Sequence, residues 1–285
     1  MAIDLVQLRS FLEVHERGTV AAAAAALGYT PPAVTQQLAK LERGLDVSLF
    51  DRVGGRLALT DAGRALAPVA QDMLALAAHA ADVVHSSPPR QRVVISGIAS
   101  ALSAVVVPSL TRLRELADVV IVEAEDAGAL RELRLGHVAV AMIQEYPGDE
   151  GARDERLDHH VVATDALRLV LPPEWPPTTR LRDLQNLPWL VNGSGTRCET
   201  ATKRVLEDAR LDASISADIS DNELLLQLVS EGYGATIVPD LVLEQTGAEV
   251  TVAAEHLGVS RTLLAVTRRR PTAATAAIVA ELCLA

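Results

Sequence analysis

The chain opens with apolar residues at helical spacing. Leucines beside Phe11 predict an amphipathic helix over residues 5–17, which Gly18 ends. Thr19 is then expected to cap a short, almost wholly alanine helix, Val20–Leu27. These features predict two closely packed helices at the start of the chain.

A third helix is predicted from Thr30, as N-cap, and Pro31, at the first helical position, to a stop at Gly44. Its apolar positions fall on one face, and its opposite face carries amides, hydroxyls and cations. The apolar face holds Val34, Leu38, Leu41 and Leu45, and the polar face holds Pro32, Gln36, Ala39 and Arg43, flanked by Thr35 and Lys40. A helix that reads a DNA groove requires this arrangement.

Two short apolar segments flanking a Gly-Gly pair follow at residues 49–60, which predicts a tight hairpin, a wing. Arg52 and Arg56 belong to it, and we assign both to the DNA backbone or the minor groove. The alternative is that these arginines form ion pairs with Asp51 or Asp61 instead of contacting DNA. This alternative applies more to Arg52 than to Arg56.

A long helix is predicted from Thr60 to about His85, since apolar residues alternate there in steps of four and three. It would be ~37 Å long, and so small a domain cannot bury its whole apolar stripe. A partner helix, and hence a dimer, is indicated. Pro68 should kink the first turns or shift the start. The stripe consists of Ala62, Leu66, Val69, Met73, Leu76, Ala80 and Val83.

A Ser-Ser-Pro-Pro-Arg hinge, residues 86–90, separates this part from a region of alternating strand and helix patterns. That alternation predicts α/β structure with a largely parallel sheet in two subdomains with a cleft between them. Predicted strands cover 93–98, 119–124, 138–143, 167–171, 189–191, 215–219 and 235–238, and predicted helices cover 102–116, 130–135, 199–209 and 223–230.

Composition and charge indicate where the protein is located and how it could bind DNA. Two cysteines, Cys198 and Cys283, cannot build a disulfide framework, and no signal peptide or membrane-spanning run is visible, so a cytoplasmic location is expected. The net charge is −11, of which residues 1–90 carry only −1. DNA affinity must therefore come from locally placed cations and from doubling the binding surface by dimerisation.

Five blocks from Gln7 to Gly63 carry a family resemblance: QLRSFLEVHERGT, AAAAALG, TPPAVTQQLAKLE, LFDR and LTDAG. In this order and spacing the chain resembles the LysR-type transcriptional regulators over essentially its whole length. Glu231-Gly232-Tyr233-Gly234 and the apolar residues after it resemble the family's closing strand.

The resemblance implies a winged helix-turn-helix (1–60), a dimerisation linker helix and hinge (61–90), and a periplasmic-binding-protein-like effector domain (91–285). Its subdomain I would cover about 91–163 and 266–285, and its subdomain II about 164–265. Implied partners are promoter DNA, a second copy of the chain as homodimer or dimer of dimers, a small-molecule effector and, at the promoter, RNA polymerase. The resemblance implies no enzyme activity, cofactor or membrane.

One departure from the family pattern affects the DNA-reading helix. The family commonly has Ser-Gln-Pro-Ala-Val-Ser-Arg where this chain has Thr30 to Gln36, so Pro31 replaces an amide and Gln36 replaces a cation. Operator preference should differ accordingly. The expected DNA contacts, which could alternatively be a merely solvated face, are Thr30, Pro32, Ala33, Thr35, Gln36, Lys40, Arg52 and Arg56.

Effector contacts are expected where helices begin after strands, because helix N-termini suit anions. Plain caps and solvated loops are the alternatives. Scarce aromatics and hydroxyl-rich loops favour a small polar acid or an amino acid as effector. The expected contacts are Ser100, Ala101, Glu125, Ser194, Gly195 and Thr196, with Asp126 as a further candidate acid.

No metal site is expected. His159 and His160 are interpreted as exposed loop residues, because adjacent histidines rarely converge on a metal and no third ligand is suitably spaced. Cys198 is interpreted as an inert thiol rather than a redox sensor.

Three other functions remain to be separated from an effector-responsive regulator. The sequence does not support an enzymatic function, since it has no Gly-x-Ser-x-Gly nucleophile elbow, no phosphate-binding loop and no Cys/His cluster. A solute-binding protein does not account for the N-terminal wing. Of the three alternatives, the sequence argues least against a DNA-binding protein without a ligand, because the cleft is inferred from the sequence alone.

Overall fold

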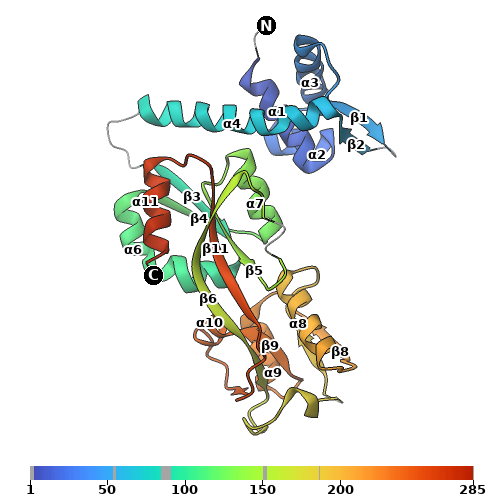
Figure 1. Ribbon diagram of the computed structural model, residues 1–285, viewed down its shortest axis with the longest axis vertical. Coiled ribbons are helices and arrows are strands. Elements are labelled where there is room, and N and C mark those ends of the chain that lie inside the picture. Colours follow the sequence, from blue (N-terminus) through green and yellow to red (C-terminus); the bar gives the residue numbers. More distant parts are fainter. Residues whose placement is uncertain (1–2, 54–55, 85–90, 150–152, 186, 285) are drawn as a thin grey trace.

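Three helices form the N-terminal part of the computed structural model, which describes residues 3–53, 56–84, 91–149, 153–185 and 187–284. Within these ranges the side chains of residues 52, 53, 56, 75 and 78–84 are not described. The helices are α1 (Leu5–Arg17), α2 (Val20–Leu27) and α3 (Pro31–Leu45), at the top of Figure 1. The bounds of α1 and α2 are as predicted, and α3 begins at the predicted residue.

Capping explains these bounds. The Thr19 side chain accepts a hydrogen bond from Ala22 N at 3.2 Å, and Thr30 accepts one from Ala33 N at 3.4 Å. The predicted stop at Gly44 is wrong: α3 continues to Leu45, and Asp46 ends it in the left-handed conformation with φ 57°.

The wing is an antiparallel hairpin of β1 (Phe50–Val53) and β2 (Arg56–Leu59), with Phe50 opposite Leu59. Its turn lies outside the described residues. The hairpin is anchored to the helices, because the Phe50 ring lies 5.4 Å from that of Phe11 in the core.

Helix α4 (Asp61–Val84) confirms the predicted long helix and runs across the top of the molecule (Figure 1). Pro68 lies inside it and does not shift its start. The predicted stripe divides into two parts. Ala62, Leu66 and Met73 pack partly against the N-terminal core, whereas Val69 and Leu76 are 52% and 67% exposed. The side chains of Ala80 and Val83 lie outside the described residues.

A mixed sheet dominates the remainder. Strands β3 (Arg92–Gly97), β4 (Asp118–Glu123) and β5 (Val140–Glu145) are parallel, but β11 (Ser260–Arg268) pairs antiparallel with both β5 and β6 (Leu157–Leu171). The prediction of a largely parallel sheet is therefore wrong, because the two longest strands run against their neighbours. Since β6 begins at Leu157, His159 and His160 lie on a strand rather than in a loop.

Helices cover both faces of β3, β4 and β5. One face packs against α6 (Val107–Leu116) and α11 (Ala273–Leu282), and the other against α7 (Asp126–Leu135). The helix predicted at 102–116 begins earlier, with α5 (Ala99–Ala101) and a π-helical segment, Leu102–Val106. We call this part lobe I.

Strands β6 and β11 pass from lobe I into a second group of elements, lobe II (Figure 1). Its cores contain Trp189 and Leu225, neither of which belongs to the cores of lobe I. Its elements are β7 (Trp189–Val191), α8 (Arg197–Asp208), β8 (Ile215–Asp218), α9 (Asn222–Ser230), β9 (Thr236–Pro239), α10 (Asp240–Leu243) and β10 (Thr251–Val252).

Helix α7 also touches the N-terminal helices. Arg17 of α1 donates from Nε to the fully buried Glu13 at 2.5 Å and from Nη2 to Glu132 of α7 at 2.9 Å. His137 lies 2.8 Å from Glu132. This charge cluster joins the N-terminal part to lobe I. None of the helices in the described ranges has the length and apolar content required to cross a bilayer.

Candidate DNA-reading surface and effector cleft

The outer face of α3 is polar and open to solvent. Thr30, Pro32, Thr35, Gln36 and Lys40 are exposed, while Val34, Leu38 and Leu41 on the opposite face are buried in the core. Gln36 and Lys40 form no hydrogen bond or ion pair with the described residues, so their polar groups are available to a ligand.

The two threonines of this face are engaged locally. Thr30 caps the helix, and the Thr35 hydroxyl donates to Pro31 O at 3.0 Å. Ala33 is half-buried. The backbone of the wing places Arg52 on β1 and Arg56 on β2, but their side chains lie outside the described residues. Gln36 and Lys40 are therefore the side chains of the predicted set with free polar groups.

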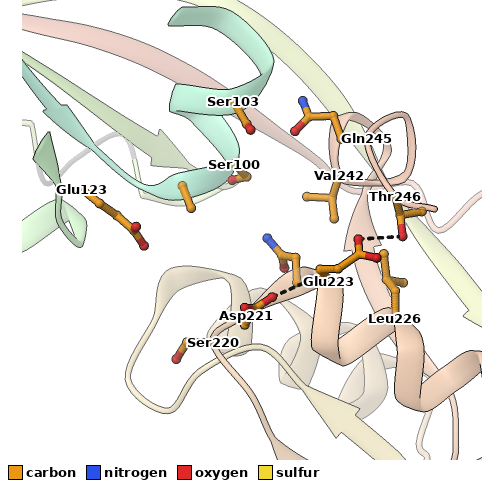
Figure 2. A pocket seen from close by; sticks show the side chains of 12 residues that line it. Ser100, Ser103, Glu123, Ser220, Asp221, Glu223, Leu226, Val242, Gln245 and Thr246 are labelled. Carbon is orange, nitrogen blue, oxygen red and sulfur yellow. Dashed lines mark hydrogen bonds between the residues drawn. The ribbon is translucent and has the colours of Figure 1, made fainter. Parts of the chain in front are cut away.

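A cavity of about 510 Å³ lies between the lobes, as Figure 2 shows. Ser100 and Ser103 enter it from lobe I, together with Glu123 at the end of β4. The start of α9 and the segment after α10 close it from lobe II. The remaining lining residues are Ala99, Ser220, Asp221, Asn222, Glu223, Leu226, Val242, Gln245 and Thr246.

A smaller recess of about 60 Å³ lies next to this cavity, and Ser100 lines both. Two further residues predicted from the sequence, Glu125 and Thr196, line the recess. Ala101 does not, because it is fully buried in the core of lobe I. Ser194 and Gly195 line neither space.

The loop before α8 satisfies its own polar groups. Ser194 is hydrogen-bonded to Asp218, Gly195 N donates to Glu199 at 2.7 Å, and Thr196 caps α8. These internal contacts account for the loop without a ligand, so the alternative of an ordinary turn fits Ser194 and Gly195.

Arg261 also lines the recess and was not among the residues predicted from the sequence. Its Nε donates to Asp165 at 2.8 Å, and its Nη1 donates to Ser100 Oγ at 2.9 Å and to Gln144 at 3.3 Å. Both charged side chains are buried. Because Asp165 neutralises Arg261, this cation adds little positive potential to the cleft.

The larger cavity is acidic. Its described lining contains three carboxylates, Glu123, Asp221 and Glu223, and no lysine or arginine. Asp221 accepts from the backbone N–H groups of Glu223 and Leu224 at 2.9 and 3.1 Å, so it uses the N-terminus of α9 that could otherwise bind an anion. Glu223 accepts from Thr246 at 3.1 Å.

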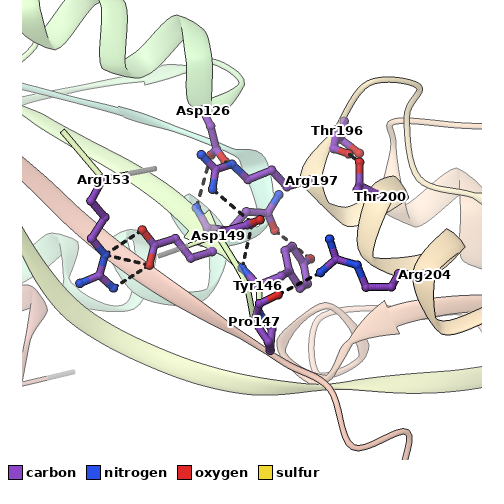
Figure 3. A network of polar contacts seen from close by, with 11 residues as sticks. Asp126, Tyr146, Pro147, Asp149, Arg153, Thr196, Arg197, Thr200 and Arg204 are labelled. Atoms are coloured by element: carbon purple, nitrogen blue, oxygen red, sulfur yellow. Dashed lines mark hydrogen bonds and ion pairs between the residues drawn. The ribbon is translucent and has the colours of Figure 1, made fainter. Parts of the chain in front are cut away.

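An arginine bridges the lobes beside the recess (Figure 3). Arg197 of α8 lies 3.3 Å from Asp126 of lobe I and donates to Asp149 at 3.3 Å. Burial raises the pKa of Asp126 to about 7, although the charge of Arg197 acts in the opposite direction. The bridge therefore changes charge near neutral pH.

This raised pKa predicts a pH effect on stability. The folded protein holds the Asp126 proton more tightly than the unfolded chain, so this contribution is complete below about pH 4 and disappears as the pH rises through about 7. Relative to Asp126→Asn, the wild-type free energy of unfolding should therefore fall between pH 5 and pH 8. Each unit by which the folded-state pKa exceeds the unfolded-state pKa contributes about 1.4 kcal/mol to this fall. Urea unfolding across this range measures it. Parallel profiles for the two proteins would contradict the assignment.

Cys198 lies within the same region and is buried. Burial raises the pKa of its thiol, although a hydrogen bond with Tyr146 acts in the opposite direction. A thiol with a raised pKa holds little thiolate, which supports an inert side chain. Within the described ranges, no three His, Cys, Asp or Glu residues gather as a metal site.

Comparisons with known proteins agree with this architecture. Residues 5–64 match the bacterial regulatory helix-turn-helix protein of the lysR family, and residues 86–284 match the LysR substrate binding domain. The chain belongs to the LysR family of DNA-binding transcriptional regulators. This confirms the resemblance, the non-enzymatic class and the presence of an effector-binding domain in this LysR regulator.

Individual relatives support the same assignment. The regulator is 28% identical over 251 residues to a probable RuBisCO transcriptional regulator of Nostoc, covering 84% of this chain and 74% of that protein. It is 45% identical over 74 residues to an uncharacterized HTH-type transcriptional regulator of Azotobacter vinelandii, covering 26% of this chain and 51% of that protein.

Solved structures share the fold. A full-length OxyR from Pseudomonas aeruginosa superposes with a TM-score of 0.68 at 17% identity, covering 99% of this chain and 94% of that one. Full-length CbnR complexed with its target DNA superposes with a TM-score of 0.55 at 21% identity, and 99% of each chain is covered.

Proposed function

We propose that this LysR regulator binds promoter DNA as a dimer or a dimer of dimers and that a small polar molecule in the cleft changes its DNA binding. The observation that carries the proposal is the combination of an exposed polar face on α3 and a polar cavity between two lobes. The cavity favours an effector-responsive protein over a regulator that has no ligand.

The DNA contacts follow from the exposed face of α3. The Gln36 amide has both a hydrogen-bond donor and an acceptor, so it can form a pair of hydrogen bonds with adenine. The Lys40 ammonium group is suited to a phosphate of the DNA backbone. Arg52 and Arg56 of the wing contribute backbone or minor-groove contacts. Such a regulator acts on DNA in the cytoplasm, beside RNA polymerase.

Two substitutions separate these roles. Gln36→Ala should alter which base is preferred at one operator position, by ~1–3 kcal/mol. Lys40→Ala should weaken binding to all duplexes about equally and reduce the salt dependence by about one phosphate contact. Binding to a library of operator variants at several salt concentrations measures both. Unchanged binding in both variants would show that α3 is not the reading surface.

The cleft also indicates the charge of the effector. Three carboxylates and no free cation line the cavity, so a ligand with a protonated amine is favoured over a plain organic acid. Hydroxyl and amide groups surround these carboxylates, and no aromatic side chain is among the described lining. Of the two classes that the sequence suggests, an amino acid fits this lining and a small acid does not.

Ser100→Trp tests the cleft as the effector site. Because Ser100 lines both the cavity and the recess, the bulky tryptophan ring would fill the space where they adjoin. The effector response should therefore be lost while DNA binding persists. A thermal-shift series with arginine, lysine, putrescine and succinate, followed by DNA binding, measures this. Ser194→Trp is the matched control, because Ser194 lines neither space. A retained response in Ser100→Trp would place the effector elsewhere.

Helix α7 offers a path from the cleft to DNA. It begins at Asp126, which meets Arg197 of lobe II, and near its end Glu132 meets Arg17 of α1. A change in the separation of the lobes would therefore move a helix that contacts the DNA-binding part directly.

A further inference from the structure

A second recess lies where the linker helix meets the effector domain, apart from the cleft between the lobes. Its volume is about 130 Å³. Helix α4 forms one wall, and the ends of α7, β6 and β11 form the other. The lining residues are Pro68, Gln71, Asp72, Arg134, Asp154, Arg156, Leu157, Arg268 and Arg269.

One of the two carboxylates in this recess is already neutralised. Asp154 lies 3.2 Å from Arg134 Nε and accepts two hydrogen bonds from the Arg156 side chain, at 2.8 and 2.9 Å, and one from the Arg156 backbone N–H, at 3.1 Å. These arginines hold the pKa of Asp154 well below its usual range, so it is ionised at neutral pH. Two guanidinium groups thus share the carboxylate of Asp154, and the charges of Asp72 and Glu16 also act on Arg156.

The other two arginines have no acidic partner among the described residues. Arg268 donates from Nη1 to Leu133 O at 2.7 Å and to Val138 O at 3.1 Å, and Arg269 donates to Glu155 O at 2.6 Å. Burial lowers the pKa of Arg268, which shows that its charge is poorly solvated. A partly buried cation without a counter-charge is unfavourable unless an anion compensates it.

The four guanidinium groups outnumber the two carboxylates, Asp72 and Asp154, by two positive charges. Planar guanidinium groups match the oxygen geometry of phosphate. The recess, at about 130 Å³, is well above the ~10–15 Å³ that a single water requires, so it has room for one tetrahedral oxyanion with a bridging water. Charge and size thus favour one doubly charged oxyanion.

We propose that this recess binds a small phosphate-like dianion, either inorganic phosphate or the phosphate group of a metabolite. Such an anion would contact Gln71 on the linker helix and the arginines of the effector domain at the same time. It would therefore hold the linker helix against the effector domain and constitute a second ligand site, independent of the cleft.

Calorimetric titration of the full-length protein with inorganic phosphate at constant ionic strength tests this site. Wild type should bind, and the double variant Arg156→Gln/Arg269→Gln should lose about tenfold or more in affinity, because two charge-assisted contacts are removed. Both side chains are exposed, so the variant should fold. Hydrogen exchange in α4 should slow on phosphate addition in wild type alone.

Two controls locate the binding. Arg112→Gln removes an arginine that pairs with Glu281, away from the recess, and Lys40→Gln removes a cation of the DNA-reading face. Both should bind phosphate as wild type does. Glycerol 3-phosphate distinguishes the sources: tighter binding than inorganic phosphate indicates a metabolite, and equal binding indicates free phosphate. Absence of binding by wild type at millimolar phosphate, or undiminished binding by the double variant, would overturn the proposal.

Discussion

Replacing Leu76 by aspartate is expected to convert the regulator to a monomer and to lower its affinity for operator DNA about a hundredfold or more. Leu76 and Val69 lie on the outer face of α4 with 67% and 52% of their surfaces exposed. A second α4 would cover them, whereas a buried, unpaired aspartate would oppose that contact. In the proposed dimer, two copies of α3 would contact one duplex, so loss of pairing would also remove the gain in affinity from binding at two sites.

Sedimentation velocity and DNA binding measure the two effects of Leu76→Asp separately. Val161→Asp is the matched control, because Val161 is 57% exposed and lies on β6 rather than on α4. Leu66→Asp is less informative, because Leu66 packs partly against the core of the DNA-binding part. A Leu76→Asp protein that sediments like wild type would show that α4 is not the dimer interface.

Arg261→Met is expected to cost the effector domain about 3–5 kcal/mol of folding free energy. The substitution leaves Asp165 buried without its partner, because Arg261 and Asp165 are 2% and 5% exposed and are joined at 2.8 Å. Among the described residues, Asp165 would retain the backbone N–H of Leu241, at 3.1 Å, as its one hydrogen-bond donor. Urea unfolding without any added ligand measures this loss.

The double variant Arg261→Met/Asp165→Asn provides the comparison. It removes the orphaned charge, so it should recover much of the lost stability. A single variant as stable as wild type would show that the ion pair contributes no specific support to the base of the cleft.

The N-terminal part could be predicted almost completely from the sequence because its signals are local. Thr19, Thr30 and Gly18 act within one turn of the helices that they start or end. The predicted end of α3 at Gly44 was wrong because Asp46, rather than Gly44, takes the left-handed conformation that glycine usually adopts at the end of a helix.

The effector domain was predicted less completely because long-range pairing decides its sheet. Strand β11, which runs antiparallel to two strands far away in the sequence, has no local pattern that fixes its neighbours or direction. Pairing with β11 also extends β6 back to Leu157, ten residues before the predicted start. Periodicity alone therefore missed β11 and the first ten residues of β6, the two strands that connect the lobes.

The cleft shows the same limit. Ser100 could be predicted because a helix begins there directly after a strand, but its neighbours in space, Asp221 and Gln245, lie far along the chain. A cap signal at Asp221, before the apolar helix α9, was available in the sequence. Nothing local indicated that Arg261 would reach Ser100.

The most direct test of the account is binding of the purified full-length protein to DNA from upstream of its own gene, compared with an unrelated duplex of equal length. We expect a preference of about 10³ or more for the upstream region, an affinity that falls steeply with salt, and a change in that affinity when an effector occupies the cleft. Equal binding to both duplexes, or binding to neither in dilute buffer, would contradict it.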